Sequence, residues 1–275
     1  MKIDAHHHFW RYDPAEYGWI DDSMPVLRRD YLPADLEPEI RRLGIDGVIS
    51  VQARQTLGET RWLVELANRH DFIRGVVGWV PLADPNLRAH LDALADERAL
   101  KAVRHVVQDE PDDSFILGAA FNAGVAALAE YQLAYDVLIF ERHLPLAVEF
   151  VDRHPQQVFV VDHLAKPRVK DGQLEPWRTN LRALAEREHV YCKLSGLATE
   201  ADHEAWTEPQ LLPYLETALE AFGPRRLMFG SDWPVSLLAC TFPAWYELVE
   251  RLAARLSAAE QARIFGGTAA EAYRL

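Results

Sequence analysis

The chain has 275 residues, of which 29 are basic and 42 acidic, so its formal net charge is −13. This acidity argues against nucleic acid or an anionic membrane as a partner, since both attract basic surfaces. No run of 18 or more apolar residues predicts a membrane span, and the N-terminus lacks a secretory hydrophobic segment. Cys192 and Cys240 are too few for a disulfide framework or a cysteine metal cluster, and they favour a cytoplasmic protein.

Short apolar runs alternate with amphipathic helical patterns along the whole chain. Strands are predicted at residues 2–6, 46–52, 73–80, 100–107, 134–139, 158–162, 189–194 and 226–230. Helical patterns lie near 34–43, 59–70, 85–97, 115–130, 142–154, 174–187, 209–222 and 243–256.

This alternation, with strands rich in Val, Ile and Leu, predicts an α/β fold with a buried parallel sheet. A single distorted (β/α)8 TIM barrel over residues 1–275 fits, because such barrels have about 250 residues. The alternative is a doubly wound open sheet, but no Gly-x-Gly-x-x-Gly follows any strand.

Two segments depart from the alternation. Residues 7–33 form a long first connection that contains Trp10 and several other aromatic residues, and connections of that length are usually functional. In a barrel this segment is expected to lie over the active site. Residues 258–275 are predicted to form a C-terminal helical tail, capped by Gly266, Gly267 and Thr268 before its last helical stretch.

The first predicted strand runs into His6-His7-His8. Side chains alternate along a strand, so His6 and His8 project from the same side, about 6.5–7 Å apart. In a barrel both would point inward at the strand's C-terminal end, where active sites are found. The alternative is a fragment of an expression tag, although three histidines are few for a tag and the following Phe9-Trp10 is not tag sequence.

Further polar residues stand at the C-terminal ends of other predicted strands. These are Arg104 and His105 in the fourth strand, His163 after the sixth, Lys193 in the seventh and Asp232 after the eighth. Histidines that precede strands, such as His70, fall at the opposite end. One such histidine is more often an ordinary core residue, but several strand ends that deliver ionisable groups to one mouth predict a site.

The chemistry follows from the groups at this mouth. The donors for one divalent ion, with zinc as the first choice, are His6, His8, His163 and Asp232. With or without a metal, Asp232 would take a proton from water, while Arg104, Lys193 or His163 stabilises the developing oxyanion. No Gly-x-Ser-x-Gly elbow is present, which argues against a serine acyl-enzyme. The sequence therefore predicts attack of water on an ester-like or amide-like carbonyl.

Four blocks resemble the amidohydrolase-2 branch of the amidohydrolase superfamily, which contains L-sugar lactonases and dicarboxylate lactonases. The blocks are IDAHHHFW at 3–10, DHLAKP at 162–167, KLSG at 193–196 and MFGSDWP at 228–234. The resemblance spans essentially the whole chain. It implies a distorted barrel that opens an L-fucono- or related L-aldonolactone by direct water attack, with Asp232 as general base. It also implies that the metal is dispensable in some members, and Arg104-His105 here replaces the bridging lysine or glutamate of binuclear members.

A sugar lactone is a neutral small molecule, which suits an acidic protein. Its hydroxyl groups need a dense set of polar partners over an aromatic floor. We expect this substrate-binding set to include Trp10, Trp79, His105 and Trp233. No oligomeric state is predicted.

Three alternatives stay open. A dicarboxylate lactone would need at least two cations at the mouth, which Arg104, Lys193, Arg54 and Lys166 could supply. A metal-dependent decarboxylase of an aromatic or muconate-type acid would need a firmly bound metal and a carboxylate-binding arginine. A non-catalytic sugar-binding barrel would not need Asp232 beside the histidines.

Overall fold

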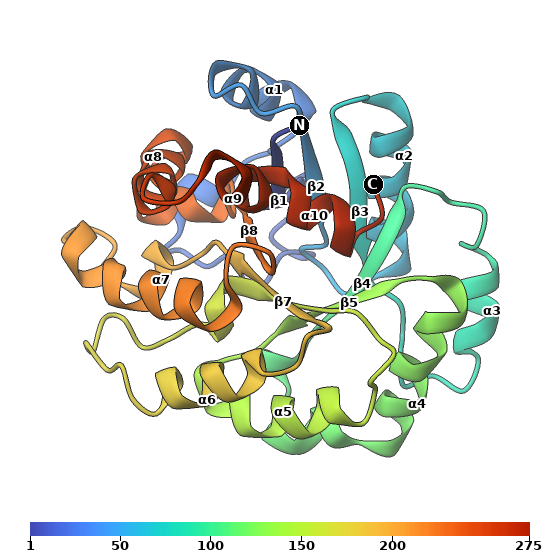
Figure 1. Cartoon of the computed structure of the whole chain (residues 1–275). Helices are drawn as coiled ribbons and strands as arrows, with labels where there is room; N and C mark the ends of the chain where they lie inside the picture. Colours follow the sequence, from blue (N-terminus) through green and yellow to red (C-terminus); the bar gives the residue numbers. More distant parts are fainter.

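The computed structural model describes all of residues 1–275 and forms a nearly closed barrel of eight parallel strands (Figure 1). The strands are β1 (Ile3–His7), β2 (Gly47–Val51), β3 (Ile73–Gly78), β4 (Leu100–Val106), β5 (Ala134–Leu138), β6 (Phe159–Val161), β7 (Val190–Leu194) and β8 (Leu227–Phe229). Each strand pairs with the next in chain order. The predicted α/β barrel and its eight strands are confirmed.

The seam between β1 and β8 is irregular, and side chains hold part of it. The backbone N–H of His8 donates to Trp233 O at 2.7 Å, beyond the end of β8. Deeper in the seam, the carboxylate of Asp4 accepts hydrogen bonds from the backbone N–H and the hydroxyl of Ser231, at 2.8 and 2.6 Å. These contacts close the ring, which an open doubly wound sheet would not do.

Helices on the outside of the barrel fill the gaps between strands, as predicted. They are α1 (Pro33–Arg42), α2 (Leu57–Arg69), α3 (Leu87–Asp92), α4 (Ala119–Leu128), α5 (Leu144–Asp152), α6 (Trp177–Ala185), α7 (Glu208–Phe222) and α8 (Phe242–Ala253), followed by α9 (Ala258–Ala262) and α10 (Thr268–Ala272). Several are shorter than predicted. In α6, for example, Pro176 stands at the N-cap, where its missing N–H costs nothing, so the helix begins after it.

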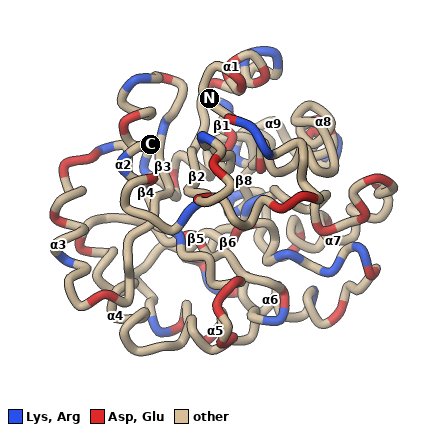
Figure 2. The backbone as a smooth tube through the Cα atoms, turned by 180° about the vertical axis from the view of Figure 1, so that it is seen from behind, with Lys and Arg blue, Asp and Glu red and all other residues tan.

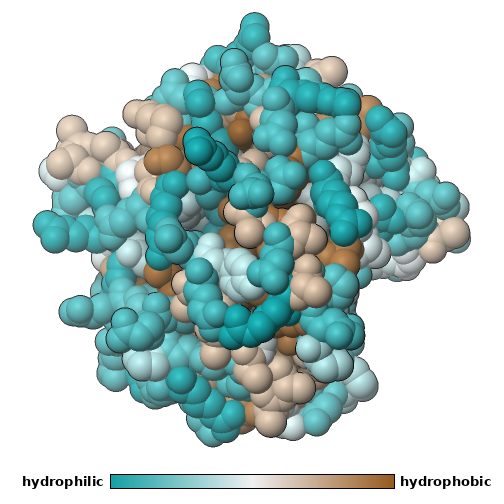
Figure 3. Space-filling view, turned by 90° about the vertical axis from the view of Figure 1, so that its right-hand side faces the viewer, coloured by the Kyte–Doolittle hydropathy of each residue, from teal (hydrophilic) through white to brown (hydrophobic).

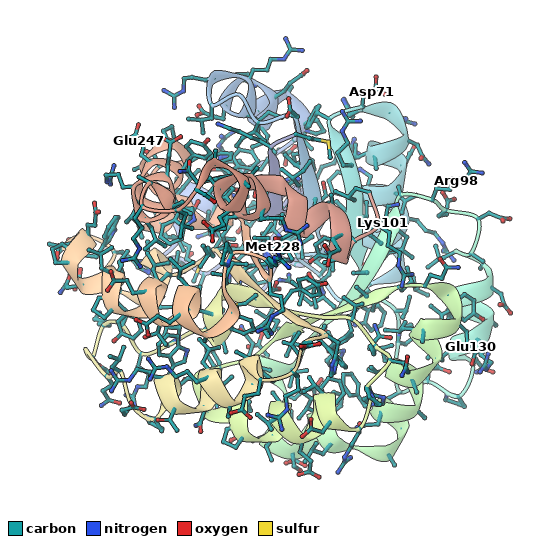
Figure 4. All side chains as sticks on the ribbon, in the orientation of Figure 1. Asp71, Arg98, Lys101, Glu130, Met228 and Glu247 are labelled. Atoms are coloured by element: carbon teal, nitrogen blue, oxygen red, sulfur yellow. The ribbon has the colours of Figure 1, made fainter.

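Apolar side chains form two cores, one between the strands and the outer helices and a smaller one inside the barrel. Met228 belongs to the inner core and lies near the middle of the molecule in Figure 4, while Asp71 and Glu130 point outward. Ala269 and Ala272 of α10 pack into the same inner core. Figure 1 shows α10 crossing in front of the strands, so the tail covers the barrel end opposite the strand C-termini.

The segment 7–33 folds back on itself through an antiparallel bridge between Trp10 and Tyr31, whose rings meet edge-on with centroids 5.4 Å apart. A short 3₁₀ turn, Pro25–Leu27, lies between these two residues. The segment is therefore ordered by its own aromatic side chains.

The outside of the molecule is polar. Charged residues of both signs are spread over the helices and connections (Figure 2). The face in Figure 3 is mostly hydrophilic, with small apolar areas between polar side chains. No helix has both the length and the apolar character needed to cross a membrane.

Candidate active site

The C-terminal ends of β1, β6 and β8 bring three imidazoles around one carboxylate oxygen. Asp232 Oδ1 lies 3.4 Å from His8 Nε2, 3.7 Å from His6 Nε2 and 3.9 Å from His163 Nε2. His6 Nε2 and His8 Nε2 are 3.2 Å apart. All four residues are buried. The four residues predicted as metal ligands are therefore neighbours in space.

Each imidazole also makes a contact through its second ring nitrogen. The contacts are His8 Nδ1 to Val51 O at 2.8 Å, His163 Nδ1 to Ser195 Oγ at 2.9 Å and His6 Nδ1 to Asp162 Oδ1 at 3.2 Å. Contacts of this kind fix the ring orientation and the tautomer of a histidine. They aim the three Nε2 atoms at Asp232.

The turn that carries His163 has an unusual backbone. Four consecutive residues, 163–166, have φ between 48° and 56°. This left-handed conformation costs an L-residue roughly 1–2 kcal/mol. The Nε1–H of Trp177 donates to Leu164 O at 2.7 Å, and both Leu164 and Ala165 are fully buried. Packing thus holds a strained turn that brings His163 and Lys166 to the same cavity, as is typical of functional sites.

Burial and neighbouring groups set the charges of this cluster. Burial lowers the pKa of His163 to about 4 and the pKa of His6 well below its usual value. Burial alone would raise the pKa of Asp232, but the adjacent His163 and His8 outweigh it, so the net shift is downward. At neutral pH the cluster therefore combines the neutral imidazoles of His6 and His163 with an ionised Asp232 carboxylate, which can accept a proton.

A cavity of about 170 Å³ opens onto the cluster. Its lining includes His8, His163 and Asp232, together with Arg104 and, from the long first connection, Trp19. The cavity is smaller than the roughly 300–1,000 Å³ of pockets for drug-sized ligands, so it suits a single small ring. A larger hollow of about 880 Å³ beside α9 and α10 contains no histidine, so the catalytic groups face the smaller cavity.

Two cations line the cavity, and each has an acidic partner. The Nη1 of Arg104 donates to Asp162 Oδ2 at 2.8 Å, and its Nη2 donates to Gln52 Oε1 at 2.8 Å. Lys166 Nζ lies 3.8 Å from Glu200. Arg104 is one of the two cations predicted to stabilise the oxyanion, and it lies in the cavity wall.

Lys193 takes a different place from the one predicted. It is completely buried and does not line the cavity. Its Nζ lies 2.5 Å from Asp136, 3.0 Å from Asp162 Oδ1 and 3.1 Å from His6 Nδ1. These partners hold its side chain inside the barrel, below the mouth. The prediction that Lys193 contacts the oxyanion therefore does not fit its position beneath His6.

The four residues predicted to bind substrate, Trp10, Trp79, His105 and Trp233, do not line the cavity. The Nε1–H of Trp79 donates to His105 Nδ1 at 3.3 Å, and His105 Nε2 contacts Glu110 at 2.7 Å. Arg104 and His105 are consecutive in β4, so when Arg104 faces the interior His105 must face the outer helices.

The two remaining residues of that set belong to the packing around the first connection. Trp10 is completely buried against Tyr17 and Tyr31, and Trp233 packs edge-on against Tyr31. None of the four aromatic rings is in position to serve as the floor of the cavity. Trp19 is the aromatic side chain that reaches the cavity.

Several residues of the site were not selected from the sequence. Asp162 directly follows β6, and Gln52 follows β2 as His8 follows β1, so the strand-end rule would have found both. Trp19 lies in the middle of a long connection, where no periodic signal points to it. Glu59 lies outside the cavity, but its Oε2 accepts the backbone N–H groups of Ala53 and Arg54 at 3.0 and 2.7 Å, which holds the connection after β2.

Three donor atoms of the cluster have the spacing that a divalent ion requires. His6 Nε2, His8 Nε2 and Asp232 Oδ1 are separated by 3.2 to 3.7 Å. Ligands held about 2.0–2.1 Å from a tetrahedral ion lie roughly 3.4 Å apart, so these three atoms fit one ion and leave a fourth position open. His163 instead joins His6 and Asp162 in a second donor group.

A buried carboxylate oxygen beside His6 supports the same fit. Asp162 Oδ1 lies 3.2 Å from His6 Nδ1 and 3.0 Å from Lys193 Nζ. A proton on His6 Nδ1 would point to this oxygen and would leave the lone pair of His6 Nε2 free for an ion. The residues present therefore fit a metal ion, and a metal-free cluster would keep the same ionised carboxylate.

Comparisons with known proteins identify full-length relatives of this chain. An L-fucono-1,5-lactonase from Burkholderia multivorans is 46% identical over 288 residues, covering 100% of this chain and 96% of the relative. An L-fucono-1,5-lactonase from Burkholderia ambifaria is 38% identical, with 100% and 96% covered.

A solved structure of an amidohydrolase from Burkholderia multivorans, described with bound Zn, matches with a TM-score of 0.96. It is 46% identical and covers 100% of this chain and 99% of that chain. The amidohydrolase family model matches residues 3–275, and the full-length relatives exceed 30% identity. This chain belongs to the amidohydrolase family.

Proposed function

We propose that this protein is a hydrolase that opens a sugar lactone, with L-fucono-1,5-lactone as the first substrate to test. The observation that carries the reaction type is the ionised Asp232 carboxylate, which sits among three imidazoles at the base of a small cavity. The sugar comes from the full-length relatives, which are L-fucono-1,5-lactonases.

Asp232 takes a proton from a water molecule as the water oxygen attacks the lactone carbonyl carbon. The negative charge that develops on the carbonyl oxygen faces the Arg104 guanidinium, which Asp162 and Gln52 hold in the cavity wall. The bond between the carbonyl carbon and the ring oxygen then breaks. The ring oxygen takes up the proton that Asp232 removed from water, which restores the Asp232 carboxylate. The product is an open-chain hydroxy acid, which ionises and releases one proton to the solution.

We propose that His6, His8 and Asp232 hold one divalent ion, with zinc as the first choice, and that His163 lies at the edge of this set. An ion bound there supplies positive charge that polarises a carbonyl group and eases the removal of a proton from water. In its absence the same imidazoles donate or accept hydrogen bonds with the substrate. Whether turnover needs the ion is decided by chelation.

The charges of the cavity favour a neutral lactone over a dicarboxylate lactone. Arg104 and Lys166 are its cations, and Asp109 and Asp232 are its anions. Both cations also have acidic partners, so neither is a free clamp for a substrate carboxylate. We therefore place a dicarboxylate lactone second and a decarboxylation third. We also propose a cytoplasmic location and no nucleic-acid partner, as the composition indicates.

A pH-indicator assay tests this function with the purified protein. A panel of L-aldonolactones, D-aldonolactones and dicarboxylate lactones is followed in weak buffer, with and without a chelator. We expect fast acidification with L-fucono-1,5-lactone above the spontaneous rate. Carbon dioxide release from an aromatic acid, without lactone opening, would instead support the decarboxylase.

A further inference from the structure

A column of polar side chains runs along the inside of the barrel beneath the active site. The Tyr273 hydroxyl, at the end of α10, donates to Asp136 at 2.8 and 3.0 Å. Asp136 of β5 contacts Lys193 of β7 at 2.5 Å, and Lys193 Nζ lies 3.1 Å from His6 Nδ1. We call Tyr273, Asp136, Lys193 and His6 the axial column. All four are at most 1% exposed.

Such a column is unusual for this fold. The interior of a parallel barrel is normally filled by layers of branched apolar side chains. Burying an ion costs several kcal/mol unless it is paired, and apolar residues of similar size are often at least as stable. The ions here do pair, since Lys193 and Arg104 stand against Asp136 and Asp162. A role in positioning His6 therefore explains the buried charges of the column better than a contribution to folding stability does.

The upper end of the column decides how His6 is held. Lys193 Nζ and Asp162 Oδ1 are 3.1 and 3.2 Å from the same atom, His6 Nδ1. An ammonium group donates to this nitrogen, whereas a carboxylate accepts its proton. The relative placement of these two groups therefore selects the tautomer of His6. It thereby decides whether His6 Nε2 presents a lone pair or a proton toward Asp232.

The lower end of the column depends on the C-terminal tail. Ala269 and Ala272 seat α10 in the inner core, which brings the Tyr273 ring inside the barrel. Gly266 allows this entry, because a Cβ there would lie 2.2 Å from Met1 O. Burial and then the adjacent Asp136 raise the pKa of Tyr273 well above its usual value, so the phenol keeps its proton and donates to Asp136.

We propose that Tyr273 is a positioning residue of the active site, and that the C-terminal tail fixes the orientation and tautomer of His6 through Asp136 and Lys193. Tyr273 touches neither the cavity nor His6, so it acts only through the column. The effect on turnover rests on the proposed function, whereas the effect on His6 does not.

The test is Tyr273→Phe, with Tyr191→Phe as matched control. The hydroxyl of Tyr191 donates to Glu271 of α10 at 2.9 Å, so each substitution deletes one phenol hydroxyl that ties the tail to the barrel. Only the Tyr273 hydroxyl belongs to the column. Imidazole ¹⁵N resonances are recorded in histidine-labelled protein, and those of His6 are assigned with a His6→Asn variant.

We expect Tyr273→Phe to shift the His6 resonances and to leave the His70 resonances unchanged. Tyr191→Phe should leave the resonances of both histidines unchanged. We also expect kcat for lactone opening to fall about 10-fold at unchanged KM, the lower end of the effect of outer-shell partners. Unchanged His6 resonances in Tyr273→Phe, or an equal change in Tyr191→Phe, would overturn the proposal.

The folded state is checked by Tm, since a merely structural role lowers Tm without a selective change at His6. If Tyr273→Phe does not fold, the test uses Asp136→Asn, which keeps the shape of the side chain. The His6 resonances are recorded in this variant, and we expect them to change in the same way. If the wild-type protein opens no lactone, the proposed function fails while the His6 resonances still decide the role of Tyr273.

Discussion

Gly196→Ala tests the placement of His163 without removing any catalytic group. Gly196 follows Ser195, and its φ is +63°. A Cβ at this position would lie 2.4 Å from His163 Nδ1 and 2.7 Å from His163 Cγ. Since ordinary contacts begin near 3.4 Å, the ring must move by about 1 Å. That movement would also break the 2.9 Å contact between His163 Nδ1 and Ser195 Oγ.

A misplacement of about 1 Å in a catalytic group costs roughly 10²-fold in rate, which corresponds to about 2.7 kcal/mol. We therefore expect kcat/KM for lactone opening to fall about 100-fold. The left-handed backbone adds about 1–2 kcal/mol of strain in the alanine variant, which lowers Tm as well.

Gly172→Ala is the matched control, because Gly172 also has φ +63° but nothing lies within 4 Å of its added Cβ. It should lose a similar amount of stability and keep wild-type kcat/KM. The assay is the pH-indicator reaction, with Tm measured on the same samples. If Gly196→Ala folds and retains wild-type kcat/KM, the placement of His163 inferred from the structure is wrong.

Three further predictions concern charge and position. Asp232→Asn should lower kcat by about 10² or more, because the amide cannot accept the water proton; unchanged turnover would exclude Asp232 as the base. His163→Asn should lower kcat, whereas His70→Asn, at the end of α2 away from the cavity, should not; equal effects would contradict the assignment of the two barrel ends. Burial raises the pKa of Glu59 to about 7, so the folded state binds this proton more tightly than the unfolded chain, and ionisation favours unfolding as the pH rises. Urea titrations should therefore show wild-type protein losing about 2.5 kcal/mol of unfolding free energy relative to Glu59→Gln between pH 5 and pH 8, and parallel curves would refute the shift.

The fold was predictable because its pattern repeats. Apolar strands and amphipathic helices alternate eight times, and each unit by itself carries the signal of its own secondary structure. The clustering of His6, His8, His163 and Asp232 followed from the same pattern. The C-terminal ends of parallel barrel strands meet at one mouth, so strand position alone brought these residues together.

The predictions that were wrong concern the direction of single side chains and their depth in the barrel. The strand-end pattern predicts both Arg104 and His105 at the mouth, yet consecutive residues of a strand face opposite sides, so only one of the two can point inward. Lys193 is predicted at the mouth, but Asp136 and Asp162 hold its Nζ inside the barrel, and no local pattern reveals these ion pairs. Trp19 lies in a connection with no periodicity, so no local pattern marks it.

The amino-acid sequence by itself determined the order of the strands, the end of the barrel that bears the chemistry and the ionisable groups that gather there. These properties depend on periodicity and chain direction, which are local. The tertiary structure alone decided which groups touch the cavity, how each imidazole is oriented and that Tyr273 enters the barrel from the tail. Those contacts join residues far apart in the chain, such as His163 and Ser195 or Tyr273 and Asp136, and they depend on how the barrel packs.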